Sequence, residues 1–140
     1  MGALSDIIES LERLTAVHHA AAAPAFARAG VTETEGALLW ALAHAERDLT
    51  MSEAATALDC DASNITLLAR RLEGAELAER IPDAVDRRTR RLHLTDAGRR
   101  VMEEVTAALE RHTPLAALTS AQRAHLRSLL DIATAGLPAR

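Results

Sequence analysis

The sequence has few of the residues and segments by which several protein classes are recognised. It lacks tyrosine and lysine, has one phenylalanine and one tryptophan, and contains a single cysteine, Cys60. One cysteine cannot form an internal disulfide, so we expect no disulfide framework and a reducing, cytoplasmic location. No run of 18 or more apolar residues occurs, and the N-terminus is amphipathic and acidic. Neither a signal peptide nor a membrane partner is therefore expected.

Catalytic motifs are also missing from the sequence. There is no Ser/His/Asp or Cys/His arrangement, no glycine-rich phosphate loop and no clustered carboxylate pair, so we expect neither enzymatic activity nor a cofactor. The six histidines form no close metal-ligand motif. His18 and His19 are adjacent, and on a helix their side chains diverge by about 100°. We therefore predict no metal site, although a site assembled from different helices is an open alternative.

The residues that are present favour one mainly α-helical domain. The chain has 140 residues, of which 49% are hydrophobic and 1% aromatic, and alanine and leucine carry most of the apolar content. Both are good helix formers, and this length can bury a core. The net charge of -4 is unevenly distributed, because residues 70–100 carry +3 and the remainder -7. The basic segment consists of arginines, whose planar guanidinium groups suit phosphates and DNA grooves.

Helix starts are marked by three capping boxes of the Ser/Thr-x-x-Glu/Gln type, at Thr32, Thr50 and Thr119. Before them, an apolar stripe from Leu4 to Leu14 predicts a first helix that runs towards an alanine-rich stretch interrupted by Pro24. Short extended runs at 77–82 and 89–94 predict a β-hairpin. The remaining helices are predicted at 33–46, 51–58, 62–74, 96–112 and 120–135.

Residues 50–75 have the spacing of a helix-turn-helix: a short helix, a tight turn, and a second helix with Asp61 as its N-cap. An apolar repeat in the second helix predicts its core face. The opposite face carries small hydroxyls, one aliphatic side chain and arginine, a set that a major groove can accommodate. An ordinary solvated helix face is the alternative interpretation. The core face is Ile65, Leu68, Ala69 and Leu72, and the outer face is Ser63, Thr66, Leu67 and Arg70.

Three segments between residue 31 and about residue 101 resemble the DNA-binding core of the MarR (multiple antibiotic resistance regulator) family. They are VTETEGALLWAL, LTMSEAATALDCDASNITLLARRLE and ERIPDAVDRRTRRLHLTDAGRR. The last is the most diagnostic, because Asp-Arg-Arg followed by Leu-x-Leu-Thr-x-x-Gly is similar to the family's wing signature. The resemblance implies a winged helix-turn-helix with a two-stranded β-hairpin wing and N- and C-terminal dimerisation helices.

In function, the resemblance implies a ligand-responsive repressor, a transcriptional regulator that binds a pseudo-palindromic double-stranded DNA operator as a homodimer. The alternative is a winged-helix protein-interaction module that does not bind DNA, in which Leu67 contacts another protein. The expected DNA-binding residues are Ser63, Asn64, Thr66, Leu67, Arg70, Arg71, Arg87, Arg88 and Arg90.

The family's wing implies a brace in which Asp86 pairs with Arg88, so that Arg87 lies at the tip, free to enter the minor groove. Two positions depart from the family pattern. Leu67 follows Thr66 where the family often has arginine, so base specificity is expected to differ. Glu76 lies where the family tends to place glycine, and Gly74 occurs earlier, so a shifted helix C-cap is expected.

The resemblance divides a single domain, 1–140, into dimerisation helices at 1–30 and 112–140 and a DNA-binding lobe with its connecting helix at 31–111. The sequence independently supports dimerisation, because a C-terminal apolar stripe has no obvious partner in a compact winged core. Packing of both terminal stripes onto their own core is the alternative. The C-terminal stripe is Leu126, Leu129, Leu130, Ala133 and Leu137.

The resemblance also implies a small-molecule effector site where the dimerisation helices meet the DNA-binding lobe. No side chain identifies the effector. Trp40, Phe26 and Arg47 could line an aromatic-ligand pocket, but Trp40 lies between Leu39 and Leu42 and is expected in the core. Cys60 is expected to be a small packed residue, with oxidation sensing as the alternative.

Overall fold

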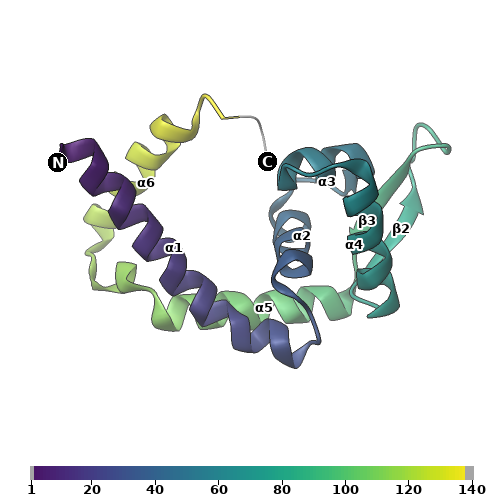
Figure 1. The fold of residues 1–140 in the computed structure, drawn as a ribbon, viewed down its shortest axis with the longest axis horizontal. Helices are drawn as coiled ribbons and strands as arrows, with labels where there is room; N and C mark the ends of the chain where they lie inside the picture. The colour runs from purple at the N-terminus through teal and green to yellow at the C-terminus, as the bar shows by residue number, and fades with distance from the viewer. Residues whose placement is uncertain (1, 138–140) are drawn as a thin grey trace.

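The structure, a computed structural model, describes residues 2–137; the predicted domain, 1–140, also includes residues 1 and 138–140, which lie outside the described residues. The long helix α1 (Ala3–Arg28) packs along α5 (Asp96–His112). At one end of this pair, α2 (Glu33–His44), α3 (Met51–Leu58) and α4 (Ala62–Gly74) form a lobe with a small sheet (Figure 1). The 3-10 helix η1 (Pro114–Ala117) and α6 (Ser120–Thr134) lie at the other end. The predicted mainly α winged-helix fold is confirmed.

Local hydrogen bonds at the helix starts explain why the predicted boundaries are close to the observed ones. All three capping boxes are formed, with the Thr32, Thr50 and Thr119 side chains accepting from the backbone N–H three residues later and the reciprocal side-chain bonds present. Asp61 caps α4 by accepting from the Asn64 N–H at 2.8 Å. These contacts satisfy backbone donors that the first helical turn leaves without partners.

Helix α1 continues to Arg28 through Pro24, the residue that interrupts the alanine-rich stretch of the sequence. Proline removes one backbone donor and crowds the preceding turn, which disfavours a helix interior. Here Ala22 and Ala25, on either side of the proline, are buried in the core cluster. Tertiary packing therefore holds the helix on both sides of a residue whose local preference opposes it.

The wing is part of a three-stranded antiparallel sheet in the order β1-β3-β2. The hairpin strands β2 (Ala78–Pro82) and β3 (Arg90–Leu94) agree with the predicted hairpin to within one residue at each end. The strand β1 (Leu49–Thr50) was not predicted, because two residues show no periodicity. It pairs Leu49 with Leu92 and Thr50 with Arg91, which ties the wing to the start of α3.

The core lies inside the lobe and extends onto α1 and α5. The predicted inner face of α4 is confirmed, since all four of its apolar residues are at most 3% exposed. The prediction that Trp40 lies in the core is wrong: its side chain is 39% exposed and stacks on His44, with ring centroids 4.0 Å apart. The largest fully buried side chains are Leu38, Leu39, Ile65, Leu72, Leu92 and Val105.

The expected shift of the helix C-cap is not found at the end of α4. Gly74 is the last helical residue, and the residue in the left-handed region is Glu76, with φ +59°. The left-handed conformation therefore remains at the position where the resemblance leads one to expect glycine, and a glutamate adopts it. A side chain with a Cβ is disfavoured there. The Thr95 hydroxyl donates to the Glu76 carbonyl at 2.7 Å and holds the turn.

The ends of the chain differ from the lobe in what they expose. Helix α6 buries none of its residues, and α1 has large apolar side chains in solvent along its N-terminal half. Within residues 2–137, no helix is both long enough and apolar enough to cross a membrane. The exposed large apolar residues of the two helices and the segment after α6 are Leu4, Ile7, Ile8, Leu11, Val17, Leu129, Leu130, Ile132 and Leu137.

Candidate nucleic-acid interface

The outer face of α4 is exposed as the helical pattern predicts. Leu67 is 47% exposed, whereas its neighbour Leu68 is 3% exposed. The Ser63 hydroxyl donates to Asp61 Oδ1 at 2.7 Å, and the Thr66 hydroxyl donates to the Ala62 carbonyl at 2.8 Å. Both hydroxyl oxygens retain acceptor capacity towards a ligand. This face therefore presents hydroxyl groups and an aliphatic side chain on one rigid helix.

The wing loop, residues 83–89, is organised by two aspartates. Asp83 Oδ1 accepts from the N–H groups of Val85 and Asp86 at 2.7 and 3.0 Å, and its own N–H donates to the Thr89 carbonyl at 2.9 Å. The Arg91 Nε donates to Asp83 Oδ2. The N–H bonds from Asp86 and Val85, followed by Arg91, lower the pKa of Asp83 to about 2. The base of the wing is thus a charged hydrogen-bonded turn.

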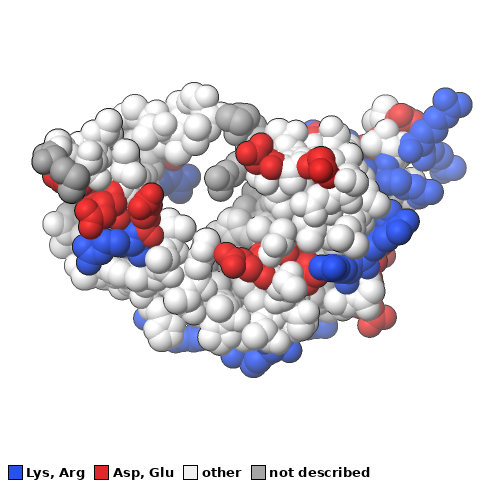
Figure 2. All heavy atoms as spheres, viewed as in Figure 1, with Lys and Arg blue, Asp and Glu red and all other residues white. Residues whose placement is uncertain are grey.

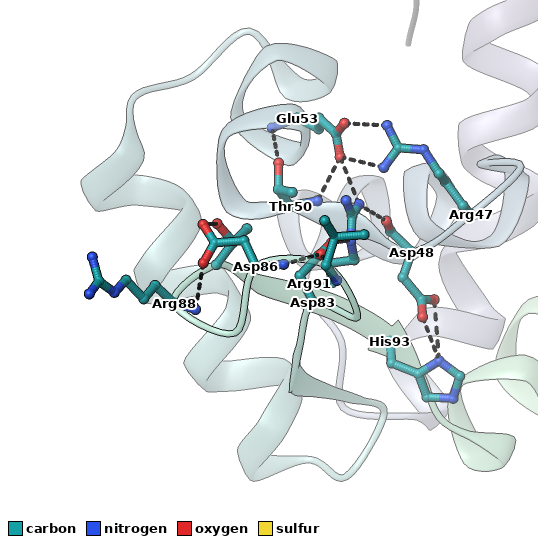
Figure 3. Close-up of polar contacts among 11 residues, drawn as sticks. Arg47, Asp48, Thr50, Glu53, Asp83, Asp86, Arg88, Arg91 and His93 are labelled. Carbon is teal, nitrogen blue, oxygen red and sulfur yellow. Dashed lines mark hydrogen bonds and ion pairs between the residues drawn. The ribbon is translucent and has the colours of Figure 1, made fainter.

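The predicted pairing of the Asp86 and Arg88 side chains is corrected by the structure. Asp86 Oδ1 accepts from the Arg88 backbone N–H at 3.0 Å, and Oδ2 accepts from the Thr89 hydroxyl at 3.1 Å. The Arg88 guanidinium points away from this carboxylate (Figure 3), and the described residues contain no ion pair between these two side chains. In a short turn, an aspartate carboxylate accepts from the backbone N–H two residues later more readily than from the side chain of that residue. The ion pair that holds the wing is Asp83–Arg91.

Positive charge gathers on one side of the lobe. Figure 2 shows arginines over α4 and along the wing, with a few acidic groups beside them and further acidic groups over the rest of this face. Among residues 2–137, Arg70, Arg87, Arg88 and Arg90 form no ion pair, but Arg71 Nη1 lies 3.5 Å from Glu35 Oε1 of α2. Four of the five predicted arginines therefore have no carboxylate of the described residues within ion-pair distance.

A second ion pair joins α4 to the first wing strand. Arg80 donates to Glu73 through its backbone N–H at 3.2 Å, through Nε at 2.9 Å and through Nη2 at 2.6 Å. The side-chain hydrogen bonds from Arg80 lower the pKa of Glu73. This fork-like contact fixes β2 relative to the helix whose outer face carries the predicted base contacts.

A cleft of about 560 Å³ lies between the end of α2, the loop that follows it, and α5. Leu42, Leu94 and Met102 supply apolar lining, and Arg47 and Asp48 contribute polar groups. Neither Trp40 nor Phe26 lines this cleft, and Phe26 instead packs against the core. Of the three residues considered for an aromatic-ligand pocket, the structure brings only Arg47 to it.

The other sensor candidates gain no support from their surroundings. Cys60 is half-buried and packs against the core, and burial, followed by the charges of Asp61 and Asp59, raises the pKa of its thiol. A thiol with a raised pKa is a poor nucleophile. In the part of the chain that the structure describes, no three histidine, cysteine or acidic residues are grouped as metal ligands.

Three residues of the polar network at the base of the wing were not predicted as functional: Glu53, Asp83 and Arg91. The sequence identified Glu53 only as a capping residue and Arg91 only as part of an alternating strand. Their contact joins residues 38 apart in the sequence and depends on the β1–β3 pairing. A two-residue strand leaves no sequence pattern from which this pairing could be read.

Comparisons with known proteins agree with this geometry. The model of the MarR family matches residues 29–89, which include α2, the helix-turn-helix and most of the wing. No curated protein matches the sequence significantly.

Several solved structures share the fold over almost the whole chain. CouR from Rhodococcus jostii RHA1, bound to p-coumaroyl-CoA, has a TM-score of 0.74 and 24% identity, covering 100% of this chain and 99% of CouR. The YusO protein from Bacillus subtilis is 32% identical, with a TM-score of 0.61 and coverage of 95% and 99%. MepR from S. aureus, in complex with DNA, is 25% identical, with a TM-score of 0.61 and coverage of 93% and 98%.

Proposed function

Because the chain belongs to the MarR family, we propose that it is a ligand-responsive transcriptional regulator that binds a pseudo-palindromic operator as a homodimer. The observation that carries this proposal is the exposed outer face of α4 beside a wing whose Arg87, Arg88 and Arg90 form no ion pair within residues 2–137. An α-helix fits the major groove, and an arginine at a wing tip fits the minor groove. MepR, which shares the fold, has been solved with DNA bound.

Within this proposal, the α4 residues read bases and the wing arginines bind the backbone and minor groove. Thr66 and Arg70 lie on the face that would enter the groove, and the exposed Leu67 side chain suits contact with a thymine methyl group. Arg71 contributes less, because part of its charge is compensated by Glu35. DNA contact by all nine predicted residues is part of this proposal.

The apolar surfaces of the two chain ends support the homodimer. Residues 1–30 and 112–140 supply the interface in this proposal, and residues 31–111 supply the DNA-binding lobe and connecting helix. A second copy of the chain would cover both stripes at once, since a two-fold axis places the same surfaces opposite each other. A dimer also presents two recognition helices to two half-sites.

The cleft beside α5 is the proposed effector site, and repression relieved by the effector is the proposed mode of action. CouR was solved bound to p-coumaroyl-CoA, which supports ligand binding in this fold. The proposal requires no cofactor and no catalytic step, and it places the protein in the cytoplasm with its operator. The exposed Leu67 also permits the alternative, a protein-interaction module without DNA binding.

A footprint combined with a salt titration tests the proposal. The purified protein is bound to fragments from around its own coding region, and we expect protection of two symmetric half-sites about one helical turn, ~10 base pairs, apart. If the protein contacts about six phosphates, its affinity for DNA should fall roughly a thousandfold as the salt concentration rises from about 50 to 200 mM. A protected site without symmetry would contradict the dimeric mode, and salt-independent association would favour the protein-interaction alternative.

A further inference from the structure

The Glu53 carboxylate, in the first turn of α3, is shared among three segments of the lobe (Figure 3). Its Oε2 accepts from the Thr50 N–H at 2.8 Å, which completes the capping box. Its Oε1 lies 2.6 Å from Arg47 Nη2, in the loop after α2. Its Oε2 also lies 3.4 Å from Arg91 Nη1, on the second wing strand. A single carboxylate thus contacts the helix-turn-helix, the loop and the wing.

The capping function alone does not require a charge at this position. The box at the start of α6 forms the same reciprocal bonds with a neutral side chain, that of Gln122, at 2.9 and 3.2 Å. What a glutamine could not supply at position 53 is charge complementarity to two arginines. The Thr50 N–H bond, followed by the Arg47 hydrogen bond, lowers the pKa of Glu53 to about 2, so the carboxylate is ionised at neutral pH.

On the wing side, Arg91 connects Glu53 to the turn that shapes the wing. The Arg91 guanidinium donates to Asp83 through Nε, and through Nη1 to the Asp48 carbonyl at 2.8 Å. Asp83 in turn accepts the N–H groups of the wing loop. The side chain of Arg91 is 24% exposed and that of Asp83 10%, so both lie at the sheet rather than in open solvent. Movement of Arg91 would therefore alter the base of the wing.

On the side away from the wing, the contacts of Glu53 lead to residues that line the cleft. Arg47 and Asp48 both line the cleft, and the Asp48 carboxylate lies 3.2 Å from His93 Nδ1 of β3. The polar chain therefore runs from Arg47 through Glu53 and Arg91 to Asp83. It is one continuous route of ion pairs between the cleft and the wing.

We propose that Glu53 is a positioning residue for DNA binding, which holds the wing at a set angle to α3 and α4 and links wing order to the state of the cleft. This inference rests on the proposed function, because a wing position matters only to a protein that binds DNA. Glu53 touches no DNA in this account. It acts through Arg91 and Asp83, so that Arg87, Arg88 and Arg90 reach the duplex together.

The first test measures wing order without DNA. Trypsin cleaves after arginine, so the rate of cleavage after Arg87 and Arg88, identified by mass spectrometry, reports opening of the wing. We expect Glu53→Gln, which keeps the cap and loses the charge, to raise this rate about fivefold. The matched control is Glu104→Gln, which removes the same charge from the exposed Arg28–Glu104 pair between α1 and α5. Equal rates in the two variants would overturn the proposal.

Arg47→Gln tests the link to the cleft. The Arg47 side chain is 61% exposed, so the fold should tolerate the change. We expect a smaller rise in wing cleavage than for Glu53→Gln, about twofold, because Arg91 keeps its contact with Glu53. Should Arg47→Gln leave the rate at the wild-type value, the route would end at Glu53 and the link to the cleft would be wrong.

The second test measures DNA binding at fixed salt. Removing a carboxylate from a DNA-binding lobe should tighten binding by simple electrostatics, whereas a loosened wing has to be ordered again and should weaken binding about fivefold. In a double-mutant cycle, Arg87→Ala should also cost less affinity in the Glu53→Gln background than in the wild type. Tighter binding or an additive cycle contradicts the positioning role. Failure of the wild-type protein to bind any duplex would contradict the proposed function instead, and the trypsin result would still stand by itself.

Discussion

The lobe buries most of its large apolar residues, whereas the two chain ends expose most of theirs. Within the lobe, the leucines and isoleucine of α4 that face inward are almost fully buried, and the capping boxes and ion pairs fix each element. Along the N-terminal half of α1 and along α6, side chains of the same type are exposed, with Ile7 at 55% and Leu129 at 51%. The lobe has a closed apolar core, whereas the chain ends expose an apolar surface that a second copy of the chain would cover.

The largest effect is expected where two adjacent leucines of α4 face opposite ways. Leu68→Ala should destabilise the fold by about 3 kcal/mol, because it leaves a cavity in the core. Leu67→Ala should change stability by less than about 0.5 kcal/mol and instead relax base preference at one position per half-site. Urea unfolding and binding to a set of single-base operator variants measure the two effects. A large loss of stability for Leu67→Ala would place that side chain within the fold and remove it from the DNA-binding face.

Charged substitutions on the chain ends should separate association from folding. Ile7→Glu and Leu129→Glu should each convert a dimer into a monomer and lower operator affinity about a hundredfold, because the two half-sites are no longer bound together. The lobe should remain folded, since neither residue belongs to the core cluster. Sedimentation measures the association state. Ser5→Glu, which introduces the same charge on α1 outside the apolar stripe, is the control, and a tight dimer in either variant would contradict the proposed interface.

A smaller effect, of the opposite sign, is expected within the lobe at Glu76. Its φ of +59° suits glycine better than a residue with a Cβ. Glu76→Gly should therefore stabilise the protein by about 1 kcal/mol, provided that the hydrogen bond from Thr95 to the backbone carbonyl is kept. Thermal unfolding compares it with Gly74→Ala, a change at a site where an added Cβ meets nothing within 4 Å. Destabilisation by Glu76→Gly would show that the glutamate side chain has a role that outweighs its backbone cost.

The smallest effect concerns the pH dependence of the wing base. The pKa of Asp83 is lowered to about 2 in the fold, below the ordinary aspartate value of about 3.9. A lowered pKa contributes stability that is fully present above the unfolded value and is lost as pH falls towards the folded value. The stability difference between wild type and Asp83→Asn should therefore be constant near neutral pH and shrink from about pH 4.5 towards pH 2. A difference that stays the same across this range would show that the charge of Asp83 does not stabilise the wing.

Much of the lobe could be predicted from the sequence because its signals are local. A capping box joins residues three apart, and the inner face of α4 follows from the helical repeat, so the starts of α2 and α3 and the burial of Ile65 could be derived without a structure. The start of α6, outside the lobe, follows from the same kind of box. The exposure of Leu67 follows from the same repeat. In the wing, the loop and both strands were predicted, but the partners of its charges were not.

What the sequence by itself determined is the α-helices, the two hairpin strands and the two faces of α4, since these depend on contacts within a few residues. Only the tertiary structure decided that α1 continues through Pro24, that Trp40 is exposed, and that Arg91 lies between Asp83 and Glu53. For α1 and for Arg91 the deciding contacts join distant segments: α1 with the core, β1 with β3, and the wing with α3. Such contacts depend on how the elements pack and on the sheet register, and neither leaves a periodic pattern in the chain.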